Sequence, residues 1–220
     1  MKDSLISVLI IFFYSCLCAC TSTIVTKSLQ PLVSSQSGDA MTLLSDSWDA
    51  DSFDDSDVED CISPSLLNAN TNLRVIPAKQ FRDNLFPYFM PSTTPHSSLE
   101  YQKLFDTPVI KKRLARQGIH YLVSIRKVTD MDKHGGIGCG AGPGGGGCFG
   151  AIAWKRKSIF EATIWDLFSS STSGTTKVST AGTGIVISPG LPIPVYFPAT
   201  ESAACNETGK QLGQAFGGVE

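Results

Sequence analysis

The side chains of this sequence best suited to chemistry are its cysteines and histidines, and two of the cysteines lie in its most unusual segment. Residues 134–150 contain ten glycines among 17 residues, together with His134, Cys139 and Cys148. A zinc site built from these three side chains would match no common spacing of zinc ligands. A nucleophilic cysteine would need a positioned histidine and an electropositive pocket, and no other part of the sequence indicates them. We therefore expect neither a metal site nor a catalytic cysteine here.

The glycines of residues 134–150 raise the alternative of a phosphate-binding loop. Such a loop presents backbone N–H groups at the start of a helix and commonly ends in Gly-Lys followed by Ser or Thr. The segment has no such ending, and the residues after Gly150 lead into another expected strand. Glycine adopts positive φ without a Cβ penalty. We therefore predict that residues 134–150 are a Gly-rich loop, a flexible connection between two neighbouring strands.

The remaining polar side chains form no catalytic pattern in the sequence. His120 begins an apolar stretch, which predicts a core or edge residue rather than a base. Glu161 and Asp166 lie five residues apart on one expected strand and hence on opposite faces of a sheet. Trp154 is expected to pack, with sugar stacking as the alternative, and residues 155–157 (Lys-Arg-Lys) form at most a small basic patch. We expect a protein that is not an enzyme and has no cofactor.

The N-terminal segment indicates export. Residues 5–17 are apolar and too short to span a bilayer comfortably as a helix, which is typical of a secretory signal. The tripeptide 17–19 (Leu-Cys-Ala) before Cys20 resembles the lipobox of bacterial lipoproteins. This resemblance implies that residues 1–19 are a lipoprotein signal peptide and that the sulfur of Cys20 carries a diacylglycerol. An ordinary secretory signal and an uncleaved anchor are the alternatives.

The lipoprotein resemblance also implies a location in the cell envelope. In Gram-negative lipoproteins an aspartate directly after the lipidated cysteine favours retention in the inner membrane. Here that residue is Thr21, which favours the outer membrane, with the protein facing the periplasm. The diacylglycerol anchor, with its palmitate-like acyl chains, would be the contact with the membrane.

Charge is unevenly distributed along the chain, although the net charge is only -2. Residues 21–60 contain nine acidic residues against Lys27 alone, whereas residues 61–220 contain 16 Lys and Arg against 10 Asp and Glu. The acidic residues lack the D-x-[DN]-x-[DN]-G spacing of a calcium loop. We predict that residues 20–40 form a flexible tether and that residues 39–60 form a solvated acidic leader, which keeps the tether extended by self-repulsion.

Four cysteines remain beyond the signal region, namely Cys61, Cys139, Cys148 and Cys205. In an exported protein a disulfide is the default state of such residues, and four cysteines allow three pairings. Closure of a short loop favours Cys139–Cys148. That pairing leaves Cys61–Cys205 to join the first helix of the domain to the last.

Residues 41–220 are predicted to form a single α/β domain. Apolar and β-branched runs predict strands at residues 41–44, 73–76, 119–128, 158–167 and 176–180. Capping residues and apolar spacing predict helices at residues 53–67, 77–86, 97–105 and 107–117 and from residue 200 onward. Strands and helices alternate first, hairpin-like strands follow, and a helix closes the chain. This order predicts a mixed sheet with flanking helices and a C-terminal helix, after a lipidated tether.

Several short motifs resemble a group of proteobacterial envelope lipoproteins without an assigned activity. The motifs lie at residues 73–77 (Leu-Arg-Val-Ile-Pro), 118–123 (Gly-Ile-His-Tyr-Leu-Val), 142–150, 161–166 (Glu-Ala-Thr-Ile-Trp-Asp) and 201–205 (Glu-Ser-Ala-Ala-Cys). More remotely, the order of elements is similar to the α/β domain of the curli-secretion lipoprotein and of the penicillin-binding-protein activator lipoproteins. A shared fold does not fix function, so neither of those activities is carried over.

These observations favour a lipid-anchored envelope protein that is not catalytic and acts as a protein-binding or assembly accessory module. Its partner is expected to be another envelope protein, and no nucleic acid is expected to bind. The alternative is a protein that binds or acts on a small ligand or glycan through the Gly-rich loop and Trp154.

Overall fold

The computed structural model describes residues 21–27, 39–46, 54–70, 72–90, 92–95, 97–142, 145–169, 171–190 and 199–217. Cys20, the expected signal peptide at residues 1–19 and most of the expected tether lie outside these residues. Contacts divide the chain into two compact units. The first unit comprises Met1–Ser22, Asp130–Lys157 and Ala181–Thr200, and the second comprises Thr23–Thr129, Ser158–Thr180 and Glu201–Glu220.

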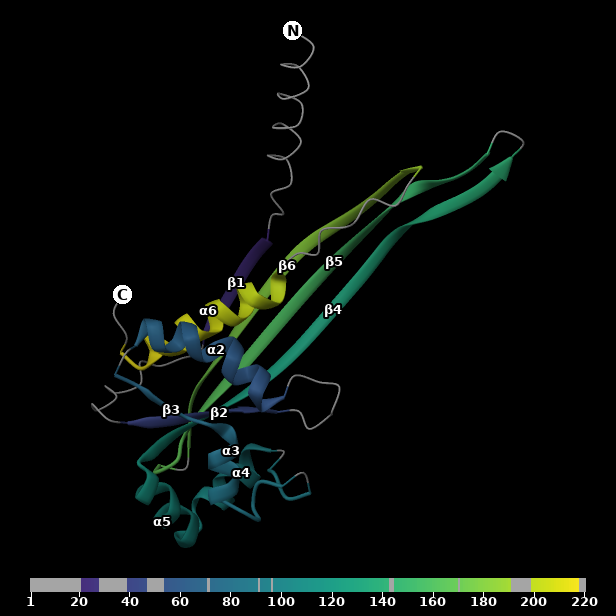
Figure 1. The fold of residues 1–220 in the computed structure, drawn as a ribbon. Coiled ribbons are helices and arrows are strands. Elements are labelled where there is room, and N and C mark those ends of the chain that lie inside the picture. The colour runs from purple at the N-terminus through teal and green to yellow at the C-terminus, as the bar shows by residue number, and fades with distance from the viewer. Residues whose placement is uncertain are drawn as a thin grey trace. The chain divides into compact units, whose positions relative to one another are not determined.

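Six strands form one mixed sheet in the order β1-β6-β5-β4-β2-β3 (Figure 1). The strands are β1 Thr21–Lys27, β2 Ala40–Ser45, β3 Arg74–Ile76, β4 Ile119–Gly142, β5 Gly145–Asp166 and β6 Ser171–Gly190. Strand β2 is parallel to both β3 and β4. Residues 143–144 and 167–170, which join β4 to β5 and β5 to β6, are too few for the crossover that parallel neighbours require, so these strands are antiparallel. The predicted α/β fold with a mixed sheet is therefore confirmed.

The helices begin and end close to the positions that their capping residues predict. They are α2 Asp55–Ala69, α3 Ala78–Asn84, α4 Ser98–Phe105, α5 Pro108–Gln117 and α6 Thr200–Ala215. The side chain of Ser97 accepts a hydrogen bond from the backbone N–H of Glu100 at the start of α4. Gly118 ends α5 in the left-handed conformation, with φ of 65°. Pro64 lies inside α2 and does not end it, because Ile62 and Leu66 on either side of it are buried.

Helices of the second unit cover both faces of its part of the sheet. One core lies under α2 and α6, and the other lies under α3, α4 and α5 (Figure 1). Along β2, Met41 and Leu43 belong to the first core, whereas Leu44 belongs to the second. This alternation is expected because successive side chains of a strand point to opposite faces. Cys205 and Leu212 on α6, and Phe216 directly after it, are buried in the first core, as their helical spacing predicts.

Helices α2 and α6 approach each other closely at two glycines of α6. A Cβ atom added at Gly209 would lie 2.6 Å from the carbonyl oxygen of Ile62 and 2.8 Å from the Cβ of Ser65. At Gly213 it would lie 2.6 Å from the Cβ of Ala69. Because the two glycines are four residues apart, they lie on one face of α6. Their lack of side chains permits this close contact.

Two segments differ from the sequence-based expectation. Residues 21–27, which we placed in a flexible tether, form the edge strand β1. Residues 134–142 and 145–150, which the sequence predicts to be a loop, continue β4 and β5 as strands, with positive φ at Gly135 and Gly145. The described side chains of residues 134–142 are exposed and carry no apolar alternation. Strand pairing there depends on backbone hydrogen bonds, which glycine can make as well as any other residue.

The acidic leader also differs in part from the expectation, because several of its described members are not simply solvated. Asp55 accepts two hydrogen bonds from the Arg82 guanidinium, at 2.6 and 3.0 Å. Glu59 accepts a hydrogen bond from a backbone N–H at the start of α3. Asp46 Oδ2 lies 2.7 Å from Arg126 Nη2. The side-chain hydrogen bond between them raises the pKa of the Arg126 guanidinium. These acids bind to the domain instead of extending away from it.

Close packing predicts the effect of substituting Gly209. In Gly209→Ala the new methyl group would overlap the α2 backbone, at a cost of roughly 1–3 kcal/mol for overpacking. The better helix propensity of alanine returns up to about 1 kcal/mol. We expect the free energy of unfolding, measured by urea denaturation, to fall by about 1–2 kcal/mol from the balance of these effects. Gln214→Ala, at an exposed position of the same helix, is the control, and an equal loss in both variants would contradict the contact.

The buried phenol of Tyr101 predicts a pH dependence. Tyr101 is 6% exposed and stacks on Trp165, and burial raises its pKa to about 12. The unfolded chain loses this proton near pH 10, whereas the folded chain keeps it. The stabilising contribution is therefore complete below about pH 10 and is lost as the pH rises towards about 12. The unfolding free energy of Tyr101→Phe should fall less steeply than that of the wild type above pH 10, and parallel pH profiles would contradict this.

Candidate functional site

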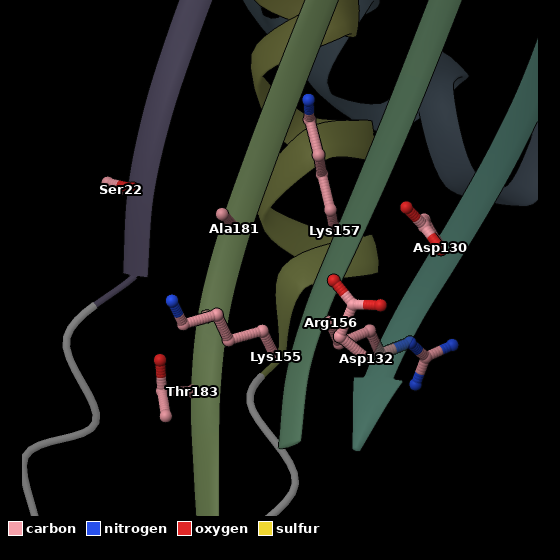
Figure 2. A pocket seen from close by; sticks show the side chains of 9 residues that line it. Ser22, Asp130, Asp132, Lys155, Arg156, Lys157, Ala181 and Thr183 are labelled. Carbon is pink, nitrogen blue, oxygen red and sulfur yellow. The ribbon is translucent and has the colours of Figure 1, made fainter. Parts of the chain in front are cut away.

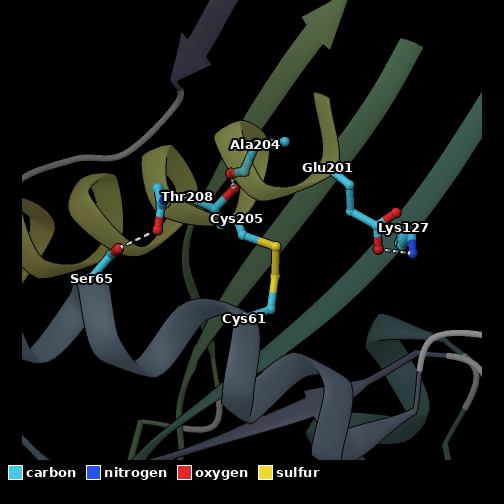
Figure 3. Close-up of a disulfide and its surroundings, with 8 residues drawn as sticks. Cys61, Ser65, Lys127, Glu201, Ala204, Cys205 and Thr208 are labelled. Atoms are coloured by element: carbon cyan, nitrogen blue, oxygen red, sulfur yellow. Dashed lines mark hydrogen bonds and ion pairs between the residues drawn. A yellow bond between two sulfur atoms is a disulfide. The ribbon is translucent and has the colours of Figure 1, made fainter. Parts of the chain in front are cut away.

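The predicted disulfide between Cys61 and Cys205 is present in the second unit (Figure 3). It joins α2 to α6, with the two Cα atoms 5.4 Å apart. One helical turn further along α2, Ser65 donates a hydrogen bond of 2.8 Å to the side chain of Asn206. At the start of α6, Glu201 forms an ion pair with Lys127 of β4. The disulfide is thus one of several contacts that hold the two helices on the same face of the sheet.

A hollow of about 460 Å³ lies beside this disulfide, and three acidic side chains line it. Its acids are Asp57, Asp60 and Glu201. Asp57 also takes part in the capping box of α2, because the backbone N–H of Asp54 donates to it. Among the described residues, no group of three or more His, Cys, Asp or Glu side chains is arranged to hold a metal ion. The acids of this hollow are accordingly used, at least in part, in capping and ion pairing.

The other predicted disulfide involves the Gly-rich strands. Cys139 lies on β4, is exposed and is disulfide-bonded. The side chain of Cys148, on β5, lies outside the part of the chain that the structure describes. The pairing of Cys139 with Cys148 therefore stays a prediction. His134 lies on β4 and is exposed.

The remaining sequence candidates do not come together as one site. His120 Nδ1 lies 2.7 Å from Asp39 Oδ1, and its ring packs edge-on against Phe168. This pair connects the start of β2 to the start of β4. Asp166 accepts hydrogen bonds from two backbone N–H groups of the turn that follows β5. Trp154 is only 7% exposed, so its ring does not present a face to a sugar.

The first unit contains a polar hollow of about 350 Å³ (Figure 2). It crosses four neighbouring strands of the sheet. The residues that line it are Ser22 on β1; Ala181, Gly182 and Thr183 on β6; Lys155, Arg156 and Lys157 on β5; and Asp130 and Asp132 on β4. Lys155 and Lys157 are two residues apart on one strand and therefore point to the same face. Figure 2 shows the Lys155 side chain crossing β6 on the side of Thr183.

The hollow offers charged groups of both signs. Lys155, Lys157, Asp130 and Asp132 are all exposed. None of these four side chains forms an ion pair within the described part of the chain. Pockets for small apolar ligands are lined mainly by apolar and aromatic side chains, and this one is not. The lining therefore suits a polar ligand that carries charge.

The sequence alone did not reveal this hollow, although it contained part of the signal. The tripeptide 155–157 was recognised as a small basic patch. Its position beside Asp130 and Asp132 depends on the register of β4 against β5, which the glycines between these strands leave undetermined in the sequence. The contribution of Ser22 depends on strand β1, and the Ser- and Thr-rich sequence of this segment predicts a tether instead.

No helix among the described residues is both long enough and apolar enough to cross a membrane. Cys20, the expected lipidation site, lies outside those residues, so lipidation stays a prediction.

Comparisons with known proteins give little further information. No protein-family model and no curated protein matches the sequence. Among solved structures, the chain is similar to the PelC dodecamer from Paraburkholderia phytofirmans, with 9% identity and a TM-score of 0.43 over 91% of this chain and 100% of that chain. A point variant of the same dodecamer in another space group has 9% identity and a TM-score of 0.42 over the same shares of the two chains. Both TM-scores are too low to support an inference from these proteins to this chain.

Loss of the Cys61–Cys205 disulfide should weaken the domain strongly. The bond closes a loop with a sequence separation of 144, for which the chain-entropy model gives about 5 kcal/mol as an upper value. We expect the paired replacement of Cys61→Ala and Cys205→Ala to lower the free energy of unfolding by about 2–5 kcal/mol, measured by urea denaturation. As a control, a reductant should destabilise the wild type more than this double variant. An equal effect on both proteins would contradict a stabilising role for this bond.

Proposed function

We propose that this chain is a lipid-anchored protein of the bacterial cell envelope, held in the outer membrane and facing the periplasm, and that it binds another protein without catalysing a reaction. The lipobox-like sequence before Cys20 supports the anchor. The disulfide between Cys61 and Cys205 supports an exported location, because structural disulfides persist in oxidising compartments such as the periplasm.

The observation that carries the protein-binding proposal is the exposed edge strand β1. It lies at one end of the strand order, so one side of its backbone has no neighbour among the described strands. Ile24, at its centre, is 66% exposed. The strand contains no proline, and its single charge is Lys27 at the end. An open edge without such protection is a template for the addition of a strand from another chain.

The other edge of the sheet is a weaker candidate. Strand β3 spans only Arg74–Ile76, and very short edge strands are one of the ways in which proteins prevent unwanted pairing. The glycan-binding alternative loses one of its two supports, since Trp154 is buried. The geometry therefore favours a protein partner at β1.

The test is site-specific photocrosslinking of the full protein in its native host. A photoreactive amino acid in place of Ile24 should capture the same protein partner reproducibly, because β1 provides both unpaired backbone groups and an exposed apolar side chain. Leu99, which is 59% exposed on α4, is the matched control position. The crosslinked species would be identified by mass spectrometry.

Two results would contradict the proposal. Capture of the same proteins from residues 24 and 99, or of none from residue 24, would remove the support for β1 as a binding edge. The N-terminal peptide from the same preparation should have Cys20 as its first residue and carry the mass of a diacylglycerol. A mature N-terminus without this mass would contradict the lipid anchor.

A further inference from the structure

The polar hollow of the first unit lies very close in the chain to the proposed anchor. Ser22 lines the hollow, and it follows Cys20 by only two residues. Two residues of fully extended chain span at most about 7 Å. A lipid on Cys20 therefore requires the hollow to lie at, or next to, the headgroup layer of the membrane. This step rests on the proposed function, because it needs the lipid at Cys20.

The charges of the hollow are arranged as two neighbouring rows. Its exposed cations, Lys155 and Lys157, come from β5, and its exposed carboxylates, Asp130 and Asp132, come from β4. These strands are neighbours in the sheet, and neighbouring strands lie about 4.8 Å apart. Because the Lys155 side chain crosses β6 (Figure 2), a ligand lying across β4, β5 and β6 would meet the carboxylates at one end and the lysine ammonium groups at the other.

We infer that this hollow binds the headgroup of a phospholipid that carries a phosphate diester and a primary ammonium, as in phosphatidylethanolamine. Lys155 and Lys157 bind the phosphate, which lysine does as a flexible point charge. Asp130 and Asp132 accept hydrogen bonds from the ammonium group.

The mixed lining distinguishes this headgroup from others. An anionic headgroup without an amine, such as that of phosphatidylglycerol, leaves both carboxylates facing negative charge. A choline headgroup has no N–H to donate, because its nitrogen carries only methyl groups. Thr183 and Ser22, which also line the hollow, carry hydroxyls that can donate to phosphate oxygens. Lys155, Lys157, Asp130 and Asp132 all find partners only when the ligand carries both phosphate and ammonium.

The test measures how strongly lipids protect two lysines from chemical acetylation, with initial rates at trace reagent so that the ammonium of phosphatidylethanolamine stays unmodified. The full mature lipoprotein is reconstituted into vesicles of phosphatidylcholine alone, or of phosphatidylcholine mixed with phosphatidylethanolamine or with phosphatidylglycerol. Acetylation rates are read by mass spectrometry and divided by those of Lys103 and Lys210, which are exposed in the second unit. We expect Lys155 and Lys157 to react several-fold more slowly in the phosphatidylethanolamine vesicles than in the other two.

A carboxylate variant separates headgroup recognition from simple burial against the bilayer. Asp132→Asn should remove most of the extra protection given by phosphatidylethanolamine, because the amide no longer carries the charge that attracts the ammonium. Asp60→Asn, an exposed acid of the second unit, should leave the protection unchanged. Both variants should keep the thermal unfolding midpoint of the wild type, which shows that the comparison is between folded proteins.

Four outcomes would overturn the inference. Equal rates in all vesicles would exclude lipid binding at the hollow, and equal protection by phosphatidylglycerol would indicate a simple anion site. Protection by inorganic phosphate without vesicles would identify free phosphate as the ligand. Unchanged protection in Asp132→Asn would exclude a role for the carboxylate. The lipid mass on Cys20, measured in the same samples, reports separately on the proposed anchor, so failure of the anchor is distinguished from failure of the headgroup site.

Discussion

Strand β2 and the first part of β4 are buried on both faces, and each face requires its own layer of helices. On β4, Val123 faces the core under α2 and α6, and Leu122 faces the core under α3, α4 and α5. Removing either layer would expose one set of apolar side chains to water. The register of β2 against β4 fixes which residues face which layer, because a shift by one residue would exchange the two faces. The two layers of helices follow from this constraint.

The uneven charge of the sequence is resolved by contacts within the second unit. The acidic segment around α2 faces cations of the later sequence, as in the bidentate contact of Asp55 with Arg82. This pair is largely shielded from water, with side-chain exposures of 24% for Asp55 and 13% for Arg82. Removing one partner would leave a poorly solvated charge. Part of the charge imbalance is therefore balanced within the fold, by pairs whose members lie far apart in the sequence.

The sequence predicted those elements whose signals are local. Ser97 and Gly118 marked helix ends through their own hydrogen bonding and backbone preferences, and the apolar stripe of α6 marked its buried face. The extent of β4 and β5 could not be predicted, because their glycines pair through the backbone and give no apolar alternation. The polar hollow could not be predicted for a related reason: its two charged rows meet only through strand register. Strand β1 was missed although Thr, Ile and Val in residues 23–26 favour strands, since Ser- and Thr-rich sequence also occurs in tethers.

The position of β1 changes how a lipid at Cys20 would act on the protein. A flexible tether would separate the events at the membrane from those in the domain, because a chain that samples many conformations transmits no orientation. Here the sheet begins at Thr21, directly after the proposed anchor. A regular strand has a defined direction, so a lipid attached one residue before it constrains the strand at the membrane surface. A lipid at Cys20 would therefore bring Ser22, the second residue after it, close to the headgroups. An orientation that a tether would leave free would in this way be restricted by the first strand of the fold.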